Sequence, residues 1–203
     1  MALSTLVKIS GVNNLSDARY CAGMGATILG FCPEPGRPGY TDTAKYREII
    51  KWISGVKIAG EFYEFTFDQI DQAQKEYHFD YIQFNDPLLV GGLEELHVPL
   101  LFDLTIEPYH DLRPAHEILD RLKGRVEIFI AEGENLPPQW AEKVGRWSHD
   151  YPLLLGTGIT RDNVVTLMKQ YNFKGISLKG GTEVKPGYYD FGELAGILEA
   201  LEL

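Results

Sequence analysis

Apolar residues gather in short runs along the chain, and longer stretches of mixed polarity separate these runs. Eight runs stand out, at residues 6–9, 27–31, 56–62, 81–84, 99–104, 126–130, 152–156 and 175–178. They are almost continuously apolar and rich in Ile, Leu, Val and Phe, which is typical of strands buried on both faces of a parallel sheet. We therefore interpret each run as a β-strand.

Stretches of helical character lie between the strands, at residues 15–24, 43–53, 67–77, 112–122, 138–147, 161–171 and 190–201, with a weaker candidate at 87–96. Asn14 can cap the first helix, and Gly25 stands where that helix would end. Strand–helix repetition predicts a parallel sheet. Eight units within 203 residues favour a compact α/β fold, a single-domain (β/α)8 barrel over residues 1–203. The alternative, an open doubly wound sheet, usually has fewer strands for this length.

Composition and charge narrow the class of partner. Apolar residues make up 44% of the chain, as in ordinary globular proteins. The net charge of −10 argues against nucleic acid or an anionic membrane as a general partner, although it allows a small anionic ligand. The sequence begins MALSTLVKIS, without a basic segment followed by an apolar one, and no apolar run approaches the ~18 residues of a membrane helix. We expect a cytoplasmic protein, either a monomer or a homodimer.

Two cysteines, Cys21 and Cys32, form no CxxC pair, and the five histidines show no HxH or HExxH spacing. This pattern favours reduced thiols over a disulfide framework. From the residues we expect no bound metal.

The loops after the seventh and eighth strands carry the strongest functional pattern, because these loops commonly hold phosphate in such barrels. The first contains Gly156, Thr157 and Gly158, and the second contains Lys179, Gly180 and Gly181. Glycines let backbone N–H groups approach an anion closely, while a hydroxyl or an ammonium group adds further donors. Glycines in one such loop would suit a tight turn equally well. Their presence in both loops favours a site for a small phosphorylated metabolite.

Other candidates lie at the carboxyl ends of predicted strands, where barrel enzymes place catalytic groups. Ser10 ends the first strand, and Arg37 in the loop after the second could bind a carboxylate or phosphate or could simply be solvated. Asp103 interrupts an apolar run, and Glu132 follows the sixth strand, so either could act as a general acid or base if partly buried. Glu61 and Asp86 stand at similar positions, but most such carboxylates are only solvated.

The same segments resemble the phosphoribosylanthranilate isomerase family nearly from end to end. Residues 8–11 (KISG) resemble the family's K-I-C-G opening, and residues 14–31 resemble its first helix and second strand. The remaining likenesses are residues 34–40 to S-P-R-Y, residues 81–85 to V-Q-L-H-G, residues 156–164 to G-G-L-x-x-x-N-V, and residues 180–190, including Pro186, Gly187 and Asp190, to S-G-V-E-x-x-P-G-x-K-D.

The resemblance implies an Amadori rearrangement in tryptophan biosynthesis, which converts an aminoaldose phosphate into an aminoketose phosphate without a cofactor. An acid protonates the ring oxygen of the ribose, and a base removes the proton at the second carbon. The phosphate would lie on the loops after strands seven and eight, and Arg37 would meet the anthranilate carboxylate.

The sequence departs from the family at the acid and the base. The family's cysteine base is replaced by Ser10, whose hydroxyl is much harder to ionise than a thiol of pKa about 8.5. Simple alignment places Ala131 at the family's acidic aspartate, and Glu132 takes that place only if the register slips by one residue. The family's histidine after the fourth strand is replaced by Asn85. Glu132 or Asp103 is therefore expected to substitute, and S10C with A131D is expected to raise isomerase turnover.

Three functions follow from these observations. The first is an isomerase of this family with an altered acid–base pair. The second is a related barrel enzyme that acts on another sugar phosphate through Ser10, Lys179 or Asp103. The third is a non-catalytic protein that keeps the phosphate loops, which the replacements at Ser10 and Ala131 would favour.

Overall fold

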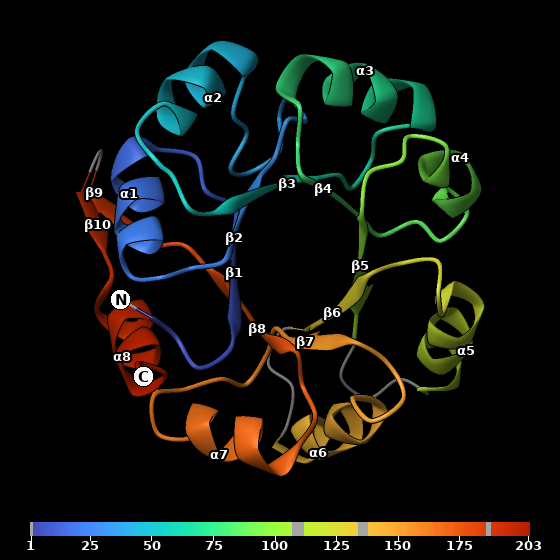
Figure 1. Ribbon diagram of the computed structural model, residues 1–203, viewed down its shortest axis with the longest axis vertical. Helices are drawn as coiled ribbons and strands as arrows, with labels where there is room; N and C mark the ends of the chain where they lie inside the picture. Colours follow the sequence, from blue (N-terminus) through green and yellow to red (C-terminus); the bar gives the residue numbers. More distant parts are fainter. Residues whose placement is uncertain (1, 107–111, 134–137, 186–187) are drawn as a thin grey trace.

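The computed structural model describes residues 2–106, 112–133, 138–185 and 188–203. Eight parallel strands form a closed barrel in sequence order, with β1 paired to both β2 and β8 (Figure 1). The barrel strands are β1 (Leu6–Ser10), β2 (Ile28–Phe31), β3 (Lys57–Glu61), β4 (Tyr81–Phe84), β5 (Leu100–Thr105), β6 (Ile128–Glu132), β7 (Leu153–Leu155) and β8 (Gly175–Lys179). The predicted closed barrel is confirmed, and the open doubly wound sheet is excluded.

Helices surround the barrel on the outside (Figure 1). They are α1 (Leu15–Gly23), α2 (Thr43–Ile50), α3 (Phe67–Tyr77), α4 (Val90–Glu94), α5 (Arg113–Leu122), α6 (Pro138–Trp147), α7 (Val164–Gln170) and α8 (Gly192–Ala200). Asn14 caps α1 as predicted, because its side chain accepts a hydrogen bond from the backbone N–H of Asp17 at 2.8 Å. The weak candidate at 87–96 is a single short helix, α4.

One element was not predicted. Between β8 and α8 the chain forms a two-stranded antiparallel pair, β9 (Thr182–Lys185) and β10 (Tyr188–Asp190), where the sequence suggested a loop. The residues between them, Pro186 and Gly187, lie outside the described part of the chain. This pair carries no continuous apolar run, so the hydrophobic pattern gave no signal for it.

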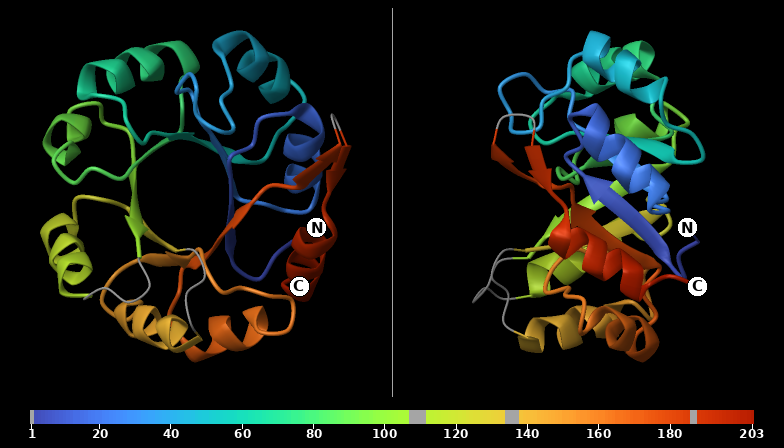
Figure 2. Two further views of the ribbon diagram at one scale, coloured as in Figure 1. Left: turned by 180° about the vertical axis from the view of Figure 1, so that it is seen from behind. Right: turned by 90° about the vertical axis from the view of Figure 1, so that its left-hand side faces the viewer.

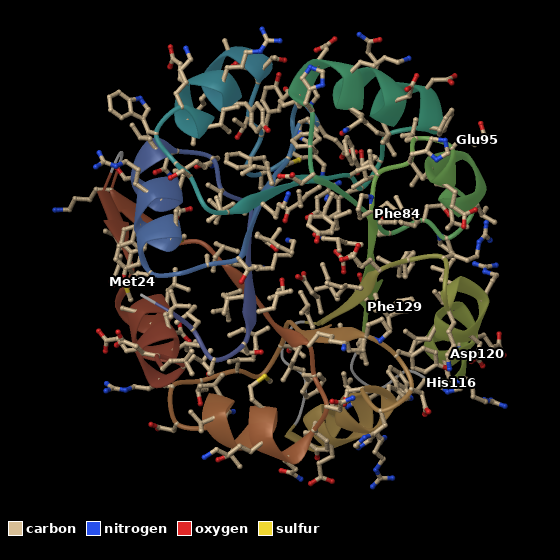
Figure 3. All side chains as sticks on the ribbon, in the orientation of Figure 1. Met24, Phe84, Glu95, His116, Asp120 and Phe129 are labelled. Atoms are coloured by element: carbon tan, nitrogen blue, oxygen red, sulfur yellow. The ribbon has the colours of Figure 1, made fainter. Side chains whose placement is uncertain are left out.

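Two apolar cores stabilise the barrel. The larger core lies between the strands and the helices, and includes Phe84 and Phe129. The smaller core fills the interior of the barrel and consists of Ile28, Ala59, Leu101, Ile128, Ile130 and Leu154. Figure 3 shows that side chains occupy the space inside the ring of strands, so the opening seen in the ribbon is packed.

The two ends of the barrel differ. The side view in Figure 2 places the β9–β10 pair at one end and both chain termini toward the other. The termini lie together, since Leu3 bridges to Glu202 and the N–H of Leu203 donates to the carbonyl of Ala2 at 3.0 Å. The end away from the termini is where the strands finish and their polar side chains gather.

Candidate active site

The interior changes from apolar to polar along the strands. Side chains alternate between the two faces of a strand, so residues two apart share a face. On β5, Leu101 belongs to the interior core, and Asp103 therefore points inward above it. On β6, Ile130 belongs to the same core, and Glu132 follows it. The carboxyl end of the barrel interior is thus lined with ionisable groups.

Lys8 and Glu61 form a buried ion pair at this end. Their side chains are 0% and 1% exposed, and Lys8 Nζ lies 2.5 Å from Glu61 Oε1. Lys8 belongs to β1 and Glu61 to β3, so the pair reaches across Gly30 of β2. A Cβ on Gly30 would lie 2.0 Å from Glu61 Oε1. Glycine at this position therefore makes room for the ion pair, which the low-dielectric interior strengthens.

Ser10 lies directly above this pair. Lys8 Nζ donates to Ser10 Oγ at 2.6 Å, and Ser10 Oγ is 3.5 Å from Ser177 Oγ on β8. Ser177 Oγ in turn donates to Glu132 Oε1 at 3.1 Å. Ser10 and Glu132, two residues singled out from the sequence, are therefore linked by hydrogen bonds through Ser177.

Burial also changes the acidity of the two inward-facing acids. The pKa of Asp103 is raised to about 7, mainly because the side chain is removed from water and also because the charge of Glu132 is near. Burial likewise raises the pKa of Glu132, against the lowering effect of Lys8. A carboxyl group that titrates near neutrality can both give and take a proton, as a general acid–base group must.

Ala131 cannot replace these acids. It is fully buried and belongs to the core between the strands and the helices, with its side chain outside the barrel. The structure therefore places Glu132, and not position 131, at the inner end of β6. The expectation that A131D would help the site is wrong, because the new carboxylate would enter the outer apolar layer.

A cavity of about 630 Å³ opens above these groups. Ser10, Glu61 and Glu132 line its floor, while Arg37 and Tyr63 line its side. The Arg37 guanidinium lies over the Tyr63 ring, 4.5 Å from its centre, and Nη1 is 2.6 Å from Glu64 Oε1. Arg37 is thus a partly buried cation at the edge of the cavity, next to an aromatic face.

A buried carboxylate holds this side of the cavity together. Glu34 is 2% exposed and accepts hydrogen bonds at 2.8–3.2 Å from the backbone N–H groups of Tyr63, Glu64 and Phe65. The loop after β2 is therefore fastened to the loop after β3. As a result, Arg37 and Tyr63 have fixed positions relative to each other.

The predicted phosphate loop after β7 borders a second cavity, of about 160 Å³. Gly156, Thr157, Gly158 and Lys179 line it together with Glu132. The Thr157 hydroxyl donates to the carbonyl of Gly133 at 2.6 Å, so it stabilises the loop and keeps only its acceptor capacity for other contacts. Lys179 lines both cavities, which makes it the cation shared between them.

The loop after β8 is tied to α1. The backbone N–H of Gly181 donates to Asp17 Oδ1 at 3.0 Å, and a Cβ on Gly180 would lie 2.2 Å from Asp17 Oδ2. Burial raises the pKa of Asp17, although the Gly181 hydrogen bond lowers it. The absence of side chains on these two glycines thus makes room for the Asp17 carboxylate, and the Gly181 N–H is already hydrogen-bonded to it.

Several site residues were missed from the sequence. The sequence pattern indicates no role for Lys8, Ser177 or Tyr63, and it presents Glu61 as one strand-end acid among several. Gln83 on β4 is 1% exposed, and neither its amide nor Asp103 Oδ1 has a hydrogen-bond partner among the described residues. The signal that could have found these residues is a polar side chain within a strand whose other residues are apolar.

Other sequence candidates lie away from this cluster. Asp86 and Asn85 are exposed after β4, and Asp86 accepts a hydrogen bond from the N–H of Leu88 at 2.9 Å. They do not line the main cavity. Within the described residues, no group of three His, Cys, Asp or Glu side chains could hold a metal ion, and no helix is long and apolar enough to cross a membrane.

Comparison with known proteins finds relatives that share one name. No family model matches the sequence. The N-(5'-phosphoribosyl)anthranilate isomerase of Aquifex aeolicus is 28% identical over 199 residues, which are 91% of this chain and 92% of the relative. The enzyme of the same name from Rippkaea orientalis is 24% identical over 208 residues, which are 97% of this chain and 95% of the relative.

Solved structures give the same fold. Phosphoribosyl anthranilate isomerase from Thermotoga maritima superposes with a TM-score of 0.79 at 17% identity, covering 97% of this chain and 98% of its own. A complex of phosphoribosyl anthranilate isomerase with reduced 1-(o-carboxyphenylamino)-1-deoxyribulose 5-phosphate superposes with a TM-score of 0.78 at 17% identity and the same coverage.

The closed barrel and the ionisable groups at the carboxyl ends of its strands have the architecture of a (β/α)8 barrel enzyme. Within that class, the end-to-end similarity to curated relatives of one name is decisive. The chain belongs to the phosphoribosylanthranilate isomerase family.

Proposed function

We propose that this protein isomerises N-(5'-phosphoribosyl)anthranilate by an Amadori rearrangement in tryptophan biosynthesis. The observation that carries this proposal is the end-to-end relationship to isomerases of that name, together with an inward-facing Glu132 beside Ser10. The alternatives, another sugar phosphate or a non-catalytic role, have no observation of this kind in their favour.

Each end of the substrate has a chemically matched part of the cavity. Arg37 would bind the anthranilate carboxylate through its planar guanidinium while the Tyr63 ring packs beside it. The loop residues Gly156 and Gly158, with Lys179, would bind the phosphate through backbone N–H groups and the ammonium charge. Thr157, Gly180 and Gly181 complete these loops.

The sugar would lie between these ends, over the polar floor. Burial raises the pKa of Glu132, which favours the protonated acid that would give its proton to the ring oxygen. Ser10 faces the cavity at the position expected for the base. Asp103, buried beside Gln83 beneath this floor, is a second carboxyl group, and its pKa of about 7 would let it exchange protons near neutrality.

A turnover assay tests the proposal. Purified protein is given freshly made phosphoribosylanthranilate, and loss of substrate fluorescence is followed above its spontaneous decay. We expect enzymatic turnover that E132Q reduces by about 10²-fold or more, as for the loss of a general acid. The matched control is E95Q, which removes an exposed carboxylate just after α4 at the periphery of the molecule (Figure 3).

The two outcomes separate the isomerase from the two other functions. Turnover by the wild type and E95Q, but not by E132Q, supports the isomerase. An inactive wild type that binds the substrate saturably contradicts it and points to a binding protein or to another sugar phosphate.

A further inference from the structure

A chain of hydrogen bonds crosses the mouth of the barrel from one acid to another. It runs from Glu61 to Lys8 at 2.5 Å, from Lys8 to Ser10 at 2.6 Å, from Ser10 to Ser177 at 3.5 Å, and from Ser177 to Glu132 at 3.1 Å. The five residues come from β3, β1, β8 and β6. Of the five, Lys8, Glu61 and Ser177 have no role in the function proposed above.

The two ends of the chain fix the direction of every donor. An ammonium group only donates, so Ser10 Oγ must accept from Lys8. Once Glu132 has given up its proton, its carboxylate only accepts, so the Ser177 proton points toward it. Ser177 can therefore only accept from Ser10, and the Ser10 proton points along the chain. This arrangement leaves one lone pair of Ser10 Oγ free toward the cavity.

We propose that Ser10 and Ser177 relay the proton of the substrate's second carbon to Glu132, so that one carboxyl group serves as both the acid and the base. This inference rests on the isomerase function proposed above.

The proton balance closes within one turnover. Glu132 first gives its proton to the ring oxygen, the ring C–O bond breaks, and a positively charged open-chain imine forms beside a Glu132 carboxylate. The C–H bond at the second carbon then breaks, and its electron pair forms the carbon–carbon double bond of a neutral enol amine. That proton goes to Ser10 Oγ, the Ser10 proton goes to Ser177, and the Ser177 proton goes to Glu132. Both serines end as hydroxyls, and Glu132 is again protonated.

This route removes the difficulty of a serine base. A serine hydroxyl is too weak an acid to supply a useful alkoxide by itself. In the relay neither serine needs to become a free alkoxide, because each loses one proton as it gains another. The final acceptor is Glu132, a carboxylate whose raised pKa makes it a better base than an exposed one.

Lys8 and Glu61 are positioning residues in this scheme. Lys8 is 0% exposed and lies below Ser10, so it does not reach the cavity itself. Its hydrogen bond occupies one lone pair of Ser10 and thereby orients the hydroxyl proton toward Ser177. Glu61 balances its charge and also accepts the N–H of Gly11 at 3.0 Å, which fixes the end of β1.

The hydrogen bond between Ser10 and Ser177 must shorten for the relay to operate. At 3.5 Å it is longer than the 2.5–3.0 Å usual for O–H···O hydrogen bonds. Hydrogen bonds in an active site often tighten when the substrate is bound. Ser177 is 2% exposed, so water cannot readily replace it as the partner of Ser10.

Removal of the Ser177 hydroxyl tests the relay. We expect S177A to lower kcat by about 10²-fold and to increase the kinetic isotope effect of deuterium at the second carbon, because that proton has lost its acceptor. S177T keeps a hydroxyl and should recover most of the lost kcat. If S177A keeps wild-type kcat, or if S177T is as impaired as S177A, the relay is wrong.

A cysteine at position 10 separates the relay from a structural role. A thiolate can take the proton itself, so the S177A penalty should shrink to below about 10-fold in the S10C background. An equal penalty in both backgrounds would mean that Ser177 only supports the fold, and would overturn the relay.

A second measurement covers the case in which S177A folds poorly. Carbon-13 NMR of the Glu132 carboxyl group should show a shifted titration in S10A, although Ser10 does not touch Glu132. An unchanged titration in S10A overturns the relay. An inactive wild type overturns the proposed function and the relay together, whereas an active wild type with an unaffected S177A overturns the relay alone.

Discussion

Asp103 and Glu132 share the polar end of the barrel interior with one lysine, Lys8, and a third acid, Glu61. Four ionisable groups in a small, water-poor volume cannot all carry full charge at low cost. Burial is the main cause that raises the pKa of both Asp103 and Glu132. The charge of Glu132 further raises the pKa of Asp103, and the charge of Glu61 further raises the pKa of Glu132.

The pH dependence of stability should reveal the raised pKa of Asp103. The pKa of Asp103 is about 7 in the folded protein and about 3.9 in an unfolded chain, so the folded state binds this proton more tightly. Between these values the free energy of unfolding therefore falls as the pH rises. The free energy of unfolding of D103N should lack this decrease. Relative to that of the wild type, it should therefore rise by up to ~4 kcal/mol from pH 4 to pH 8. Urea unfolding at both pH values measures it, and parallel profiles for the two proteins would contradict the assignment.

Position 131 gives a second prediction at the residue scale. A131D would place an unpaired carboxylate in the apolar layer outside the barrel, where Ala131 is fully buried. We expect a loss of about 4 kcal/mol or more in stability and no gain in turnover. S10C alone should instead raise turnover, because a thiol ionises more readily than a hydroxyl. Turnover assays and urea unfolding of the two single variants test this, and a faster, stable A131D would show that the side chain can reach the site.

Among the structural elements, the loops and the contacts that hold them shape the cavity more than the strands do. Glu34 fastens the loop after β2 to the loop after β3 through three backbone N–H groups. Asp17 on α1 does the same for the loop after β8 through Gly181. Both acids are buried and both serve backbone donors that would otherwise lack partners. The loops at the barrel mouth therefore have defined positions without regular secondary structure.

Loss of the Glu34 contacts should loosen one side of the cavity. In E34Q a side-chain N–H₂ group replaces Oε2, which accepts from the N–H of Glu64 at 3.2 Å, and the remaining hydrogen bonds lose the charge of the carboxylate, at a cost of about 1–3 kcal/mol. Since Arg37 and Tyr63 lie on these loops, we expect KM for the substrate to rise more than kcat falls. Urea unfolding and steady-state kinetics measure the two effects.

E64Q is the matched control for that variant. Glu64 also pairs with Arg37, but its side chain is 77% exposed, and exposed ion pairs contribute little. Its stability should stay within about 0.5 kcal/mol of wild type. Equal losses in E34Q and E64Q would show that burial of Glu34 is not what matters.

The closed barrel brings distant parts of the chain together at one mouth. The loops after β7 and β8 face the loop after β2, more than a hundred residues earlier, only because β8 pairs with β1. The phosphate and carboxylate ends of a single ligand can therefore be held at once. The local cations Lys179 and Arg37 allow this in a chain whose net charge is −10.

Ligand binding to the folded protein should raise its melting temperature. Ribose 5-phosphate carries the sugar and phosphate without the anthranilate group, and at about 100 times its Kd it should stabilise the fold by about 2.7 kcal/mol. For a chain of this size the Tm should rise by roughly 5–10 °C. Thermal unfolding with ribose 5-phosphate, with ribose as the control, measures this. Equal shifts with both sugars would argue against a phosphate site in the β7 and β8 loops.

The sequence by itself determined the local elements and the fold class. Buried parallel strands are continuous apolar runs, and apolar residues in helices recur about every 3.6 residues. Both patterns can therefore be recognised within a short stretch of consecutive residues. The helices at 67–77 and 138–147 match their predictions, and the six other predicted helical spans differ mainly at their ends or, for 87–96, in length. A helix start such as Asn14 depends on residues three positions apart, which the sequence also displays.

Only the tertiary structure decided the site. Whether Asp103 faces inward, and whether position 131 or 132 lies inside, depends on strand register, where a shift of one residue reverses the face. The Lys8–Glu61 pair needs two strands that are not neighbours and a glycine between them. Ser177 meets Ser10 only after the last strand closes on the first. These contacts join residues from 53 to 167 positions apart, and no local pattern specifies such distances before the barrel has closed.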